Sequence, residues 1–351
     1  MALQRVLSGA TRALCLFGFI LMGCGTPTPS STHDAGSMMQ DMPRDASAED
    51  LGGRDTPVDM RVDTQDSSMD LADRGGEDQG FARDMRGVPD DGGDMRDGAE
   101  DLSGAHCDDL LASFEQRPTS GSPPPYSGTV WYDRNIITSE DPTSFQGLTY
   151  RGEGERTMFD RRTNSFNRVE ARLYEAEFGA TSKRMVEIQV NPEFDEPTAR
   201  QYAEAYAEVI GRLPAFLFRD LKTVWIHDGD QLFGGGNNNL LIHTKQGENY
   251  IADGVLEEVF LHEGAHTSLD AYHASDATWL EAQRQDGQFI SDYARDNPLR
   301  EDVSETIGPF LAITYRADRL DPAKIEAVRE AIPNRITYLL CQPEITMEIL
   351  D

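Results

Sequence analysis

The chain has 351 residues, of which 62 are acidic and 32 are basic, so its formal net charge is −30. This acidic excess excludes a typical nucleic-acid-binding protein, because phosphates are bound through basic patches. The sequence also lacks the motifs of a phosphate-binding loop and of a nucleophile elbow, which excludes the chemistries built on them.

The first 24 residues are typical of a bacterial export signal. Arg5 and Arg12 form a positive region before an apolar stretch, residues 13–22, that is too short to span a bilayer. The stretch leads into Leu-Met-Gly-Cys, ending at Cys24, which resembles the lipobox of bacterial lipoproteins. The resemblance implies cleavage and lipidation at Cys24, and Gly25 after it implies an outer-membrane lipoprotein, facing the periplasm or the surface. The alternative is an ordinary secretory signal with a chance cysteine.

Residues 25–105 have the composition of a disordered linker. They contain 20 acidic and 7 basic residues, few aromatic or β-branched ones, and the triplet Asp-Met-Arg at 59–61, 84–86 and 94–96. Such a segment cannot bury enough apolar surface to offset its ordering entropy, so we expect an extended stalk. The aspartate spacing does not match a calcium-binding repeat.

The remaining residues, 106–351, are long enough for one domain with a substantial core. Of the four cysteines, Cys15 would leave with the signal and Cys24 would carry lipid, which leaves Cys107 and Cys341 near the two ends of the domain. In an exported protein these two are expected to form a disulfide, worth about 4 kcal/mol in the chain-entropy model. The alternative is two free thiols.

The first part of this domain reads as strands and loops. Apolar and polar residues alternate in several segments, or apolar β-branched residues cluster between turn signals. These predicted strands are 127–138, 168–179, 184–192, 221–229 and 237–244, the last following the glycine-rich turn that starts at Gly234.

The second part reads as helices, after one helix among the strands. Residues 195–214 have apolar side chains at helical spacing, with Pro197 near the start and Gly211 near the end. Further helices are predicted over 253–272, with Asp253 as N-cap, and over 300–319 and 321–340. The fold class is therefore α+β, with a mixed sheet followed by a helical C-terminal half.

Residues 262–266 read His-Glu-Gly-Ala-His, an H-E-x-x-H motif inside a predicted helix. Positions i and i+4 share one helix face, so His262 and His266 can bind the same metal ion, and Glu263 lies beside them as a general base. The alternative is two solvated helix histidines.

A catalytic zinc site needs a third protein ligand. Asp270 is excluded, because it would lie roughly 12 Å from His262 along the helix axis. His273 would suit a metzincin-like site, but it comes one residue late, and Leu269 occupies the position where a glycine would permit the turn. His273 remains an alternative to a ligand further along the chain.

Glu301 and Glu305, four residues apart in a predicted helix, are that distant candidate. With H-E-x-x-H they resemble the gluzincins, and most closely the lethal-factor-like pattern of H-E-x-x-H, a tyrosine and E-x-x-x-E. The resemblance implies a zincin-like fold holding one zinc ion, with Glu301 as third ligand and Glu305 orienting a ligating imidazole. Glu305 departs from the aspartate of many gluzincins.

The same resemblance implies a zinc endopeptidase acting on peptides or proteins. Glu263 would activate the zinc-bound water, Tyr293 would stabilise the oxyanion, and the strand around Gly234 would pair with extended substrate. The alternatives for Tyr293 and the glycines are a packed aromatic and a simple hairpin turn. His227 and His243 are expected to be structural.

Two other functions stay open at this stage. One is a non-catalytic peptide-binding lipoprotein with a structural zinc site, although such a site has no use for Glu263. The other is a zinc amidase that acts on cell-wall peptides, which an outer-membrane anchor would suit. The predicted partners are a peptide or protein substrate and, through the lipid, a membrane; the oligomeric state is not indicated.

Overall fold

The computed structural model describes residues 104–117 and 123–351. The predicted signal peptide, the lipidation site Cys24 and the predicted linker up to residue 103 lie outside these residues. Within the described ranges, no helix is both long and apolar enough to cross a membrane.

The described part of the chain contains one six-stranded mixed sheet and ten α-helices, which confirms the predicted α+β class. The strands are β1 (Phe145–Asp160), β2 (Ser165–Phe178), β3 (Arg184–Val190), β4 (Thr223–His227), β5 (Gly234–Gly236) and β6 (Asn239–His243). The helices are α2 (Gly104–Ala112), α3 (Glu196–Ile210), α4 (Thr244–Asp253), α5 (Leu256–Ser268), α6 (Asp270–His273), α7 (Ala277–Asp286), α8 (Asp292–Asp296), α9 (Asp302–Tyr315), α10 (Pro322–Ala331) and α11 (Pro333–Leu340), with 3-10 turns η1 (Ala215–Phe218) and η2 (Ala317–Arg319).

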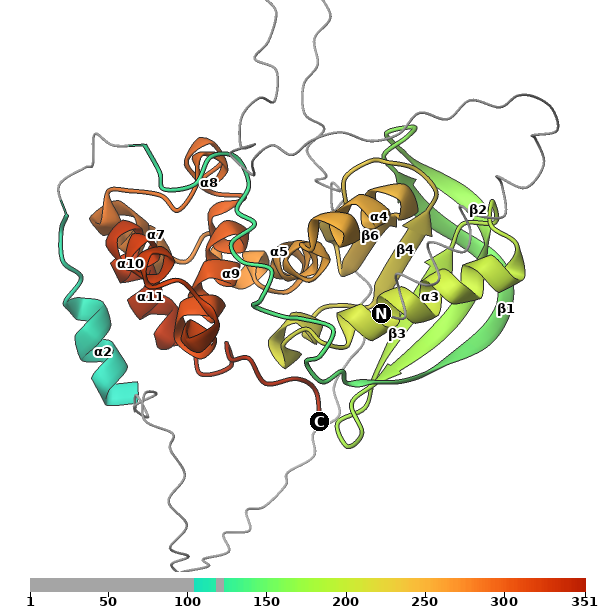
Figure 1. The fold of residues 1–351 in the computed structure, drawn as a ribbon, viewed down its shortest axis with the longest axis horizontal. Helices are drawn as coiled ribbons and strands as arrows, with labels where there is room; N and C mark the ends of the chain where they lie inside the picture. The colour runs from blue at the N-terminus through green and yellow to red at the C-terminus, as the bar shows by residue number, and fades with distance from the viewer. Residues whose placement is uncertain (1–103, 118–122) are drawn as a thin grey trace, which may run out of the picture. The chain divides into compact units, whose positions relative to one another are not determined.

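The strands follow the order β1-β2-β3-β4-β6-β5, so β5 is an edge strand. Strands β3, β4 and β6 run parallel, whereas β1, β2 and β5 pair antiparallel with their neighbours. Helices α3, α4 and α5 lie against one face of this sheet, and α7, α9, α10 and α11 form the helical half beside α5 (Figure 1). Helix α5 therefore lies between the sheet and the helical half, with β5 on one side and α9 on the other.

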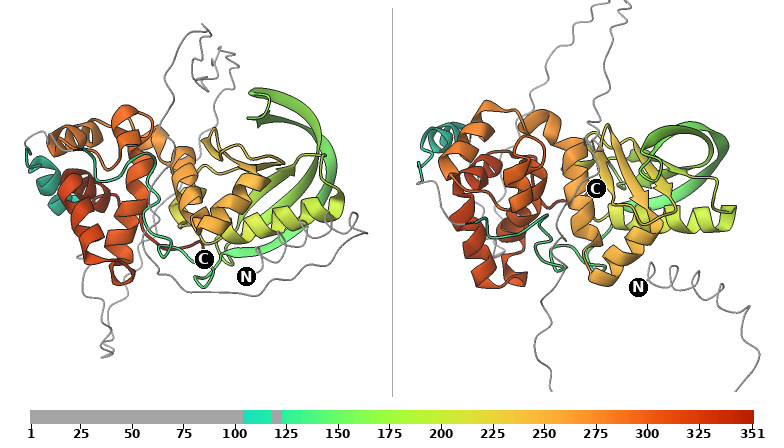
Figure 2. Two further views of the ribbon diagram at one scale, coloured as in Figure 1. Left: turned by 45° about the horizontal axis from the view of Figure 1, so that its top comes forward. Right: turned by 90° about the horizontal axis from the view of Figure 1, so that it is seen from above.

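The β1–β2 hairpin is longer than the sequence predicted and curls over the other face of the sheet (Figure 2). The ladder is shifted in register between Tyr150 and Gly152, and Gly152 has a φ of +95°. Such a bulge increases twist and bends the strand. The curl brings Met158 and Leu173 into a small apolar cluster with Trp225 of β4.

The predicted strand over 127–138 is wrong. This segment forms no strand, and the isolated bridge to Ser291 is made by Tyr126, the residue before it. Its alternation arises because Val130 and Tyr132 are buried against helices while Trp131 between them is 36% exposed. Side chains hold its backbone instead of a ladder: Glu305 accepts from the N–H of Val130, and Glu258 accepts from the N–H of Tyr132.

The predicted helix over 253–272 is in fact interrupted. Helix α4 ends at Asp253, and Gly254 follows it in the left-handed conformation, with φ +74°. A left-handed glycine ends a helix, so Asp253 closes α4 and is not the N-cap of α5. The predicted helix over 321–340 is likewise two helices, because Pro333 begins α11 after α10 has ended.

Two contacts that are distant in sequence hold the helical half together. The predicted disulfide between Cys107 and Cys341 is confirmed, with a Cα–Cα distance of 5.6 Å, and it joins α2 to the end of α11. Arg335 of α11, fully buried, forms ion pairs with Asp286 of α7 and Asp302 of α9. The second of these pairs fixes the start of α9, where Glu301 precedes the first helical residue.

Candidate metal centre

Two helices bring the three predicted ligands together. His262 and His266 project from α5, and Glu301 occupies the N-cap position of α9, which packs beside α5 (Figure 1). His262, His266 and Glu301 are the one group in the described ranges whose ligand atoms could hold a metal ion. His266 and Glu301 are 35 positions apart in the sequence, and the packing of α5 against α9 brings their side chains together.

The three ligand atoms form a small triangle. Nε2 of His266 lies 3.1 Å from Nε2 of His262 and 3.1 Å from Oε2 of Glu301, and the third edge, from His262 to Glu301, is 3.5 Å. Three ligands of a tetrahedral zinc ion with bonds of 2.0–2.1 Å are expected about 3.3 Å apart. The triangle therefore has the dimensions that a tetrahedral ion requires.

The outer ring nitrogens set which atoms face this triangle. Nδ1 of His266 lies 2.7 Å from Oδ2 of Asp270 and 2.9 Å from the hydroxyl of Ser304. A carboxylate only accepts hydrogen bonds, so Nδ1 of His266 carries a proton, and Nε2 is the nitrogen left to bind an ion in the triangle. Asp270 is thus not a ligand, as the sequence predicted, but it orients one.

His262 is held in the same sense by Glu305. Nδ1 of His262 lies 3.4 Å from Oε1 of Glu305, which is a contact longer than an ordinary hydrogen bond. The other oxygen of Glu305 accepts from the Ser291 hydroxyl at 2.6 Å and from the N–H of Val130 at 2.9 Å. With both outer nitrogens facing carboxylates, three acceptor atoms converge on one point, an arrangement that a cation stabilises.

The charged groups around the triangle also favour a positive charge at the site, as the pKa shifts of His266 and Glu301 indicate. Burial lowers the pKa of His266, but its bonds to Asp270 and Glu301 outweigh burial and raise that pKa to about 10. Burial raises the pKa of Glu301, yet the two imidazoles hold it well below its usual range. The site thus favours a positive charge beside a carboxylate that stays ionised.

Tyr293 and Arg300 hold the second oxygen of Glu301. The Tyr293 hydroxyl donates to Oε1 at 3.0 Å, and Nε of Arg300 lies 3.0 Å from the same atom. Oε2 is left to face the imidazoles. We conclude that Glu301 is arranged to bind an ion through one oxygen, and that Tyr293 lies beside the site, where the sequence predicted it.

The orienting carboxylate gives a direct prediction. Asp270→Ala is expected to weaken the affinity for a divalent metal ion about 10- to 100-fold, because the His266 ring loses its strongest hydrogen bond. The measurement is competition with a zinc-binding dye. Asp253→Ala, which removes an exposed carboxylate at the end of α4, should leave the affinity unchanged. Equal affinity in the Asp270 and Asp253 variants would mean that Ser304 alone orients the ring.

The edge strand β5 lies directly against α5 at Glu263. A Cβ atom on Gly235 would lie 1.9 Å from the carbonyl oxygen of Glu263, so only glycine fits there. The Thr267 hydroxyl joins the two elements, because it accepts from the N–H of Gly236 at 2.9 Å and donates to the carbonyl of Glu263 at 3.0 Å. The Glu263 side chain is half-buried, and it makes no hydrogen bond within residues 104–117 and 123–351.

This close approach predicts that Gly235→Ala displaces β5 from α5 or prevents folding. The clash is with backbone, which cannot rotate away, so we expect a loss of at least about 2 kcal/mol in the free energy of unfolding. The measurement is urea denaturation followed by circular dichroism. Gly308→Ala in α9, where a Cβ would meet nothing within 4 Å, should be stabilising by about 1 kcal/mol. Equal stability of the two variants would contradict the packing described.

The segment before β1 places one aromatic side chain, Trp131, beside the metal site, which the sequence did not predict. The Trp131 ring lies 6.1 Å from the His262 ring and 6.1 Å from the Tyr250 ring, and it is 36% exposed. Buried Glu258 holds this segment through the N–H groups of Tyr132 and Asp133, and burial raises the pKa of Glu258 to about 7. No sequence signal distinguishes Trp131 from a core residue, because its position depends on Glu258 and Glu305.

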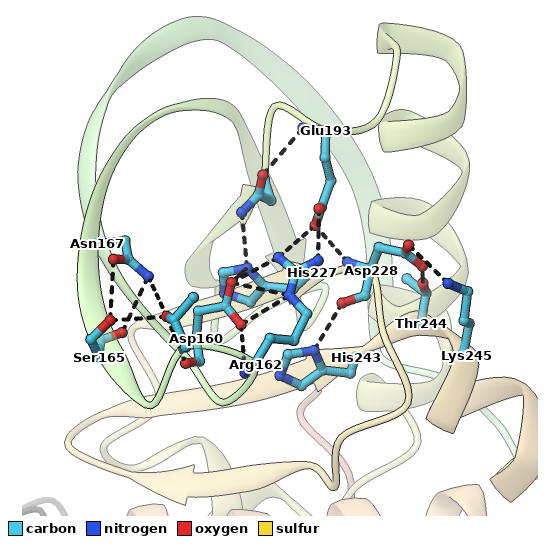
Figure 3. A network of polar contacts seen from close by, with 12 residues as sticks. Asp160, Arg162, Ser165, Asn167, Glu193, His227, Asp228, His243, Thr244 and Lys245 are labelled. Atoms are coloured by element: carbon cyan, nitrogen blue, oxygen red, sulfur yellow. Dashed lines mark hydrogen bonds and ion pairs between the residues drawn. The ribbon is translucent and has the colours of Figure 1, made fainter.

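Three further histidines of the domain, His227, His243 and His273, do not contribute to the triangle. His273 is buried and its Nδ1 lies 2.8 Å from the Tyr338 hydroxyl, which leaves it no part in the metal group. His227 and His243 stack at the ends of β4 and β6 in a separate polar network (Figure 3). Burial lowers the pKa of His227 to about 4.

Comparisons with protein-family models, curated proteins and solved structures found no match to this chain.

Proposed function

We propose that this protein is a zinc-dependent peptidase of gluzincin type with a zincin-like domain. The observation that carries the proposal is the triangle of His262, His266 and Glu301, whose edges of 3.1, 3.1 and 3.5 Å fit a tetrahedral ion. Two histidines and one carboxylate are the ligand set of hydrolytic zinc sites, which keep the fourth position for water. A purely structural zinc site is normally closed by a fourth protein ligand.

In this proposal Glu263 and Tyr293 have separate roles in hydrolysis. When bound, zinc would polarise the scissile carbonyl and lower the pKa of a neighbouring water molecule. Glu263 accepts a proton from that water as its oxygen bonds to the carbonyl carbon, and donates it to the amine nitrogen as the C–N bond breaks. Tyr293, whose hydroxyl donates to Glu301 in the free protein, would redirect that hydrogen bond to the carbonyl oxygen as negative charge develops there.

The substrate would bind as an added strand beside β5. Asn237 and Asn238, both with positive φ, form the two-residue turn between β5 and β6. Gly236 pairs with Asn239 beside this turn, with its N–H bonded to the Thr267 hydroxyl, and Gly235 is the next residue along the strand. The alternation of an antiparallel ladder then turns the N–H and C=O groups of Gly235 toward the open edge. These groups lie beside Glu263 and can pair with the backbone of an extended peptide.

The test is hydrolysis of a fluorescently labelled unfolded protein by the purified chain. We expect cleavage that a zinc chelator abolishes and that added zinc restores. If the zinc-loaded protein cleaves muropeptides but not the unfolded protein, the activity is that of a cell-wall amidase and not of a peptidase. No cleavage of either substrate would leave peptide binding as the function. The export signal and Cys24 make an outer-membrane lipoprotein the setting that we propose for this activity.

A further inference from the structure

Arg161, at the tip of the curled β1–β2 hairpin, lies over the same edge strand. We propose that Arg161 selects extended peptides that carry an aspartate or glutamate side chain at the position next to Gly234. This inference rests on the proposed function for the use of β5 as the binding edge, and it adds the class of substrate.

The hairpin tip is fixed on the sheet by the residues on either side of Arg161 (Figure 3). The Arg162 guanidinium binds Asp160 at 2.7 Å and Glu193, in the loop after β3, at 2.7 Å. Asp160 in turn lies 3.8 Å from Nδ1 of the buried His227, at the carboxyl end of β4. Because both of its chain neighbours are anchored, the backbone of Arg161 is held in place over the sheet.

The Arg161 side chain extends across the sheet to β5. A Cβ atom built on Gly234 would lie 2.9 Å from Nη2 of Arg161 and 3.6 Å from Cβ of Leu241, the residue paired with Gly234 on β6. The guanidinium therefore lies over the face of β5 that is turned away from α5, where the absence of a side chain on Gly234 makes room for it.

Side chains alternate between the two faces of a strand, and this alternation predicts which substrate side chain would face Arg161. Gly235 faces α5, so Gly234 and the residue beside it on an added strand face the opposite way. Side chains that lie opposite each other on neighbouring strands are in contact. A peptide bonded to the free groups of Gly235 would therefore direct the adjacent side chain toward the Arg161 guanidinium.

The charge of Arg161 is available for this contact. Arg162 is paired with Asp160 and Glu193, so these nearby carboxylates are already used. Arg161 itself is exposed and has no hydrogen bond or ion pair to any residue in 104–117 or 123–351. A guanidinium binds a carboxylate through two parallel hydrogen bonds, which makes an acidic side chain its best partner.

Peptide binding tests the inference independently of catalysis. The probes are fluorescein-labelled ten-residue peptides of alanine and serine, each with one glutamate, one glutamine or one lysine at successive positions. Binding to the zinc-loaded Glu263→Gln protein is measured by fluorescence anisotropy at low ionic strength. We expect one position at which glutamate binds about tenfold more tightly than glutamine, a preference that weakens as salt is raised.

Substitutions at Arg161 in the same background identify the residue responsible. Arg161→Gln should abolish the preference, and Arg161→Glu should reverse it in favour of a lysine at that position. Arg168→Gln is the control, because Arg168 lies on the same hairpin with its side chain 73% exposed. A preference that persists in Arg161→Gln, or an absence of peptide binding in the parent protein, overturns the inference. Hydrolysis of unfolded protein by the unsubstituted enzyme tests the proposed function separately.

Discussion

Glu263→Gln is expected to lower kcat/KM for peptide hydrolysis by about 10²- to 10⁴-fold while the protein still binds one zinc ion. Glutamine has nearly the shape of glutamate but cannot accept the proton of the attacking water. Glu263 contributes no atom to the triangle of ligands, so the metal should remain. The measurements are steady-state kinetics on a labelled peptide and metal analysis of the same sample.

The control for this substitution is Glu204→Gln, which changes an exposed glutamate on α3 and should leave the rate unchanged. A wild-type rate in Glu263→Gln would show that another group is the general base. Loss of zinc together with activity would instead make Glu263 a ligand, and the division of roles among the residues of α5 would be wrong.

Arg335→Met is expected to lower the free energy of unfolding by about 3–5 kcal/mol. It leaves Asp286 and Asp302, which are both buried, without the guanidinium that neutralises them. Removing one partner of a buried ion pair costs this much because the remaining charge is uncompensated. The measurement is urea denaturation followed by circular dichroism.

Two further variants separate charge from packing. In the triple variant Arg335→Met, Asp286→Asn, Asp302→Asn no charge remains buried, so most of the lost stability should return. Arg329→Met on α10 breaks an exposed ion pair with Glu326 and should cost at most about 1 kcal/mol. If the triple variant is no more stable than Arg335→Met, the loss comes from packing around Arg335 and not from charge.

The sequence predicted those parts of the site that lie close together in the chain. The spacing of His262, Glu263 and His266 places the two imidazoles on one face of a helix, whatever the rest of the fold. Glu301 followed from a resemblance to a family pattern, since local spacing disfavours His273 but does not identify a ligand further along the chain. The structure distinguishes them, because His273 bonds Tyr338 and Glu301 faces the imidazoles.

Apart from the Cys107–Cys341 disulfide, the contacts between distant segments could not be predicted from the sequence. Trp131 stands beside His262 because two buried carboxylates, Glu258 and Glu305, hold the backbone of its segment. The alternation that suggested a strand there reflects burial against helices. Arg161 reaches β5 only because the β1–β2 hairpin bends, and the register shift that accompanies the bend depends on how the two strands pair.

The measurement that tests the account most directly is the metal content of the purified protein by elemental mass spectrometry, beside His266→Ala and Glu301→Ala. The account predicts about one zinc ion per chain in the unsubstituted protein and its loss in both variants. Zinc retained in Glu301→Ala would contradict the proposed third ligand. No zinc in a folded protein that was purified without chelator and then supplied with zinc would contradict the metal site itself.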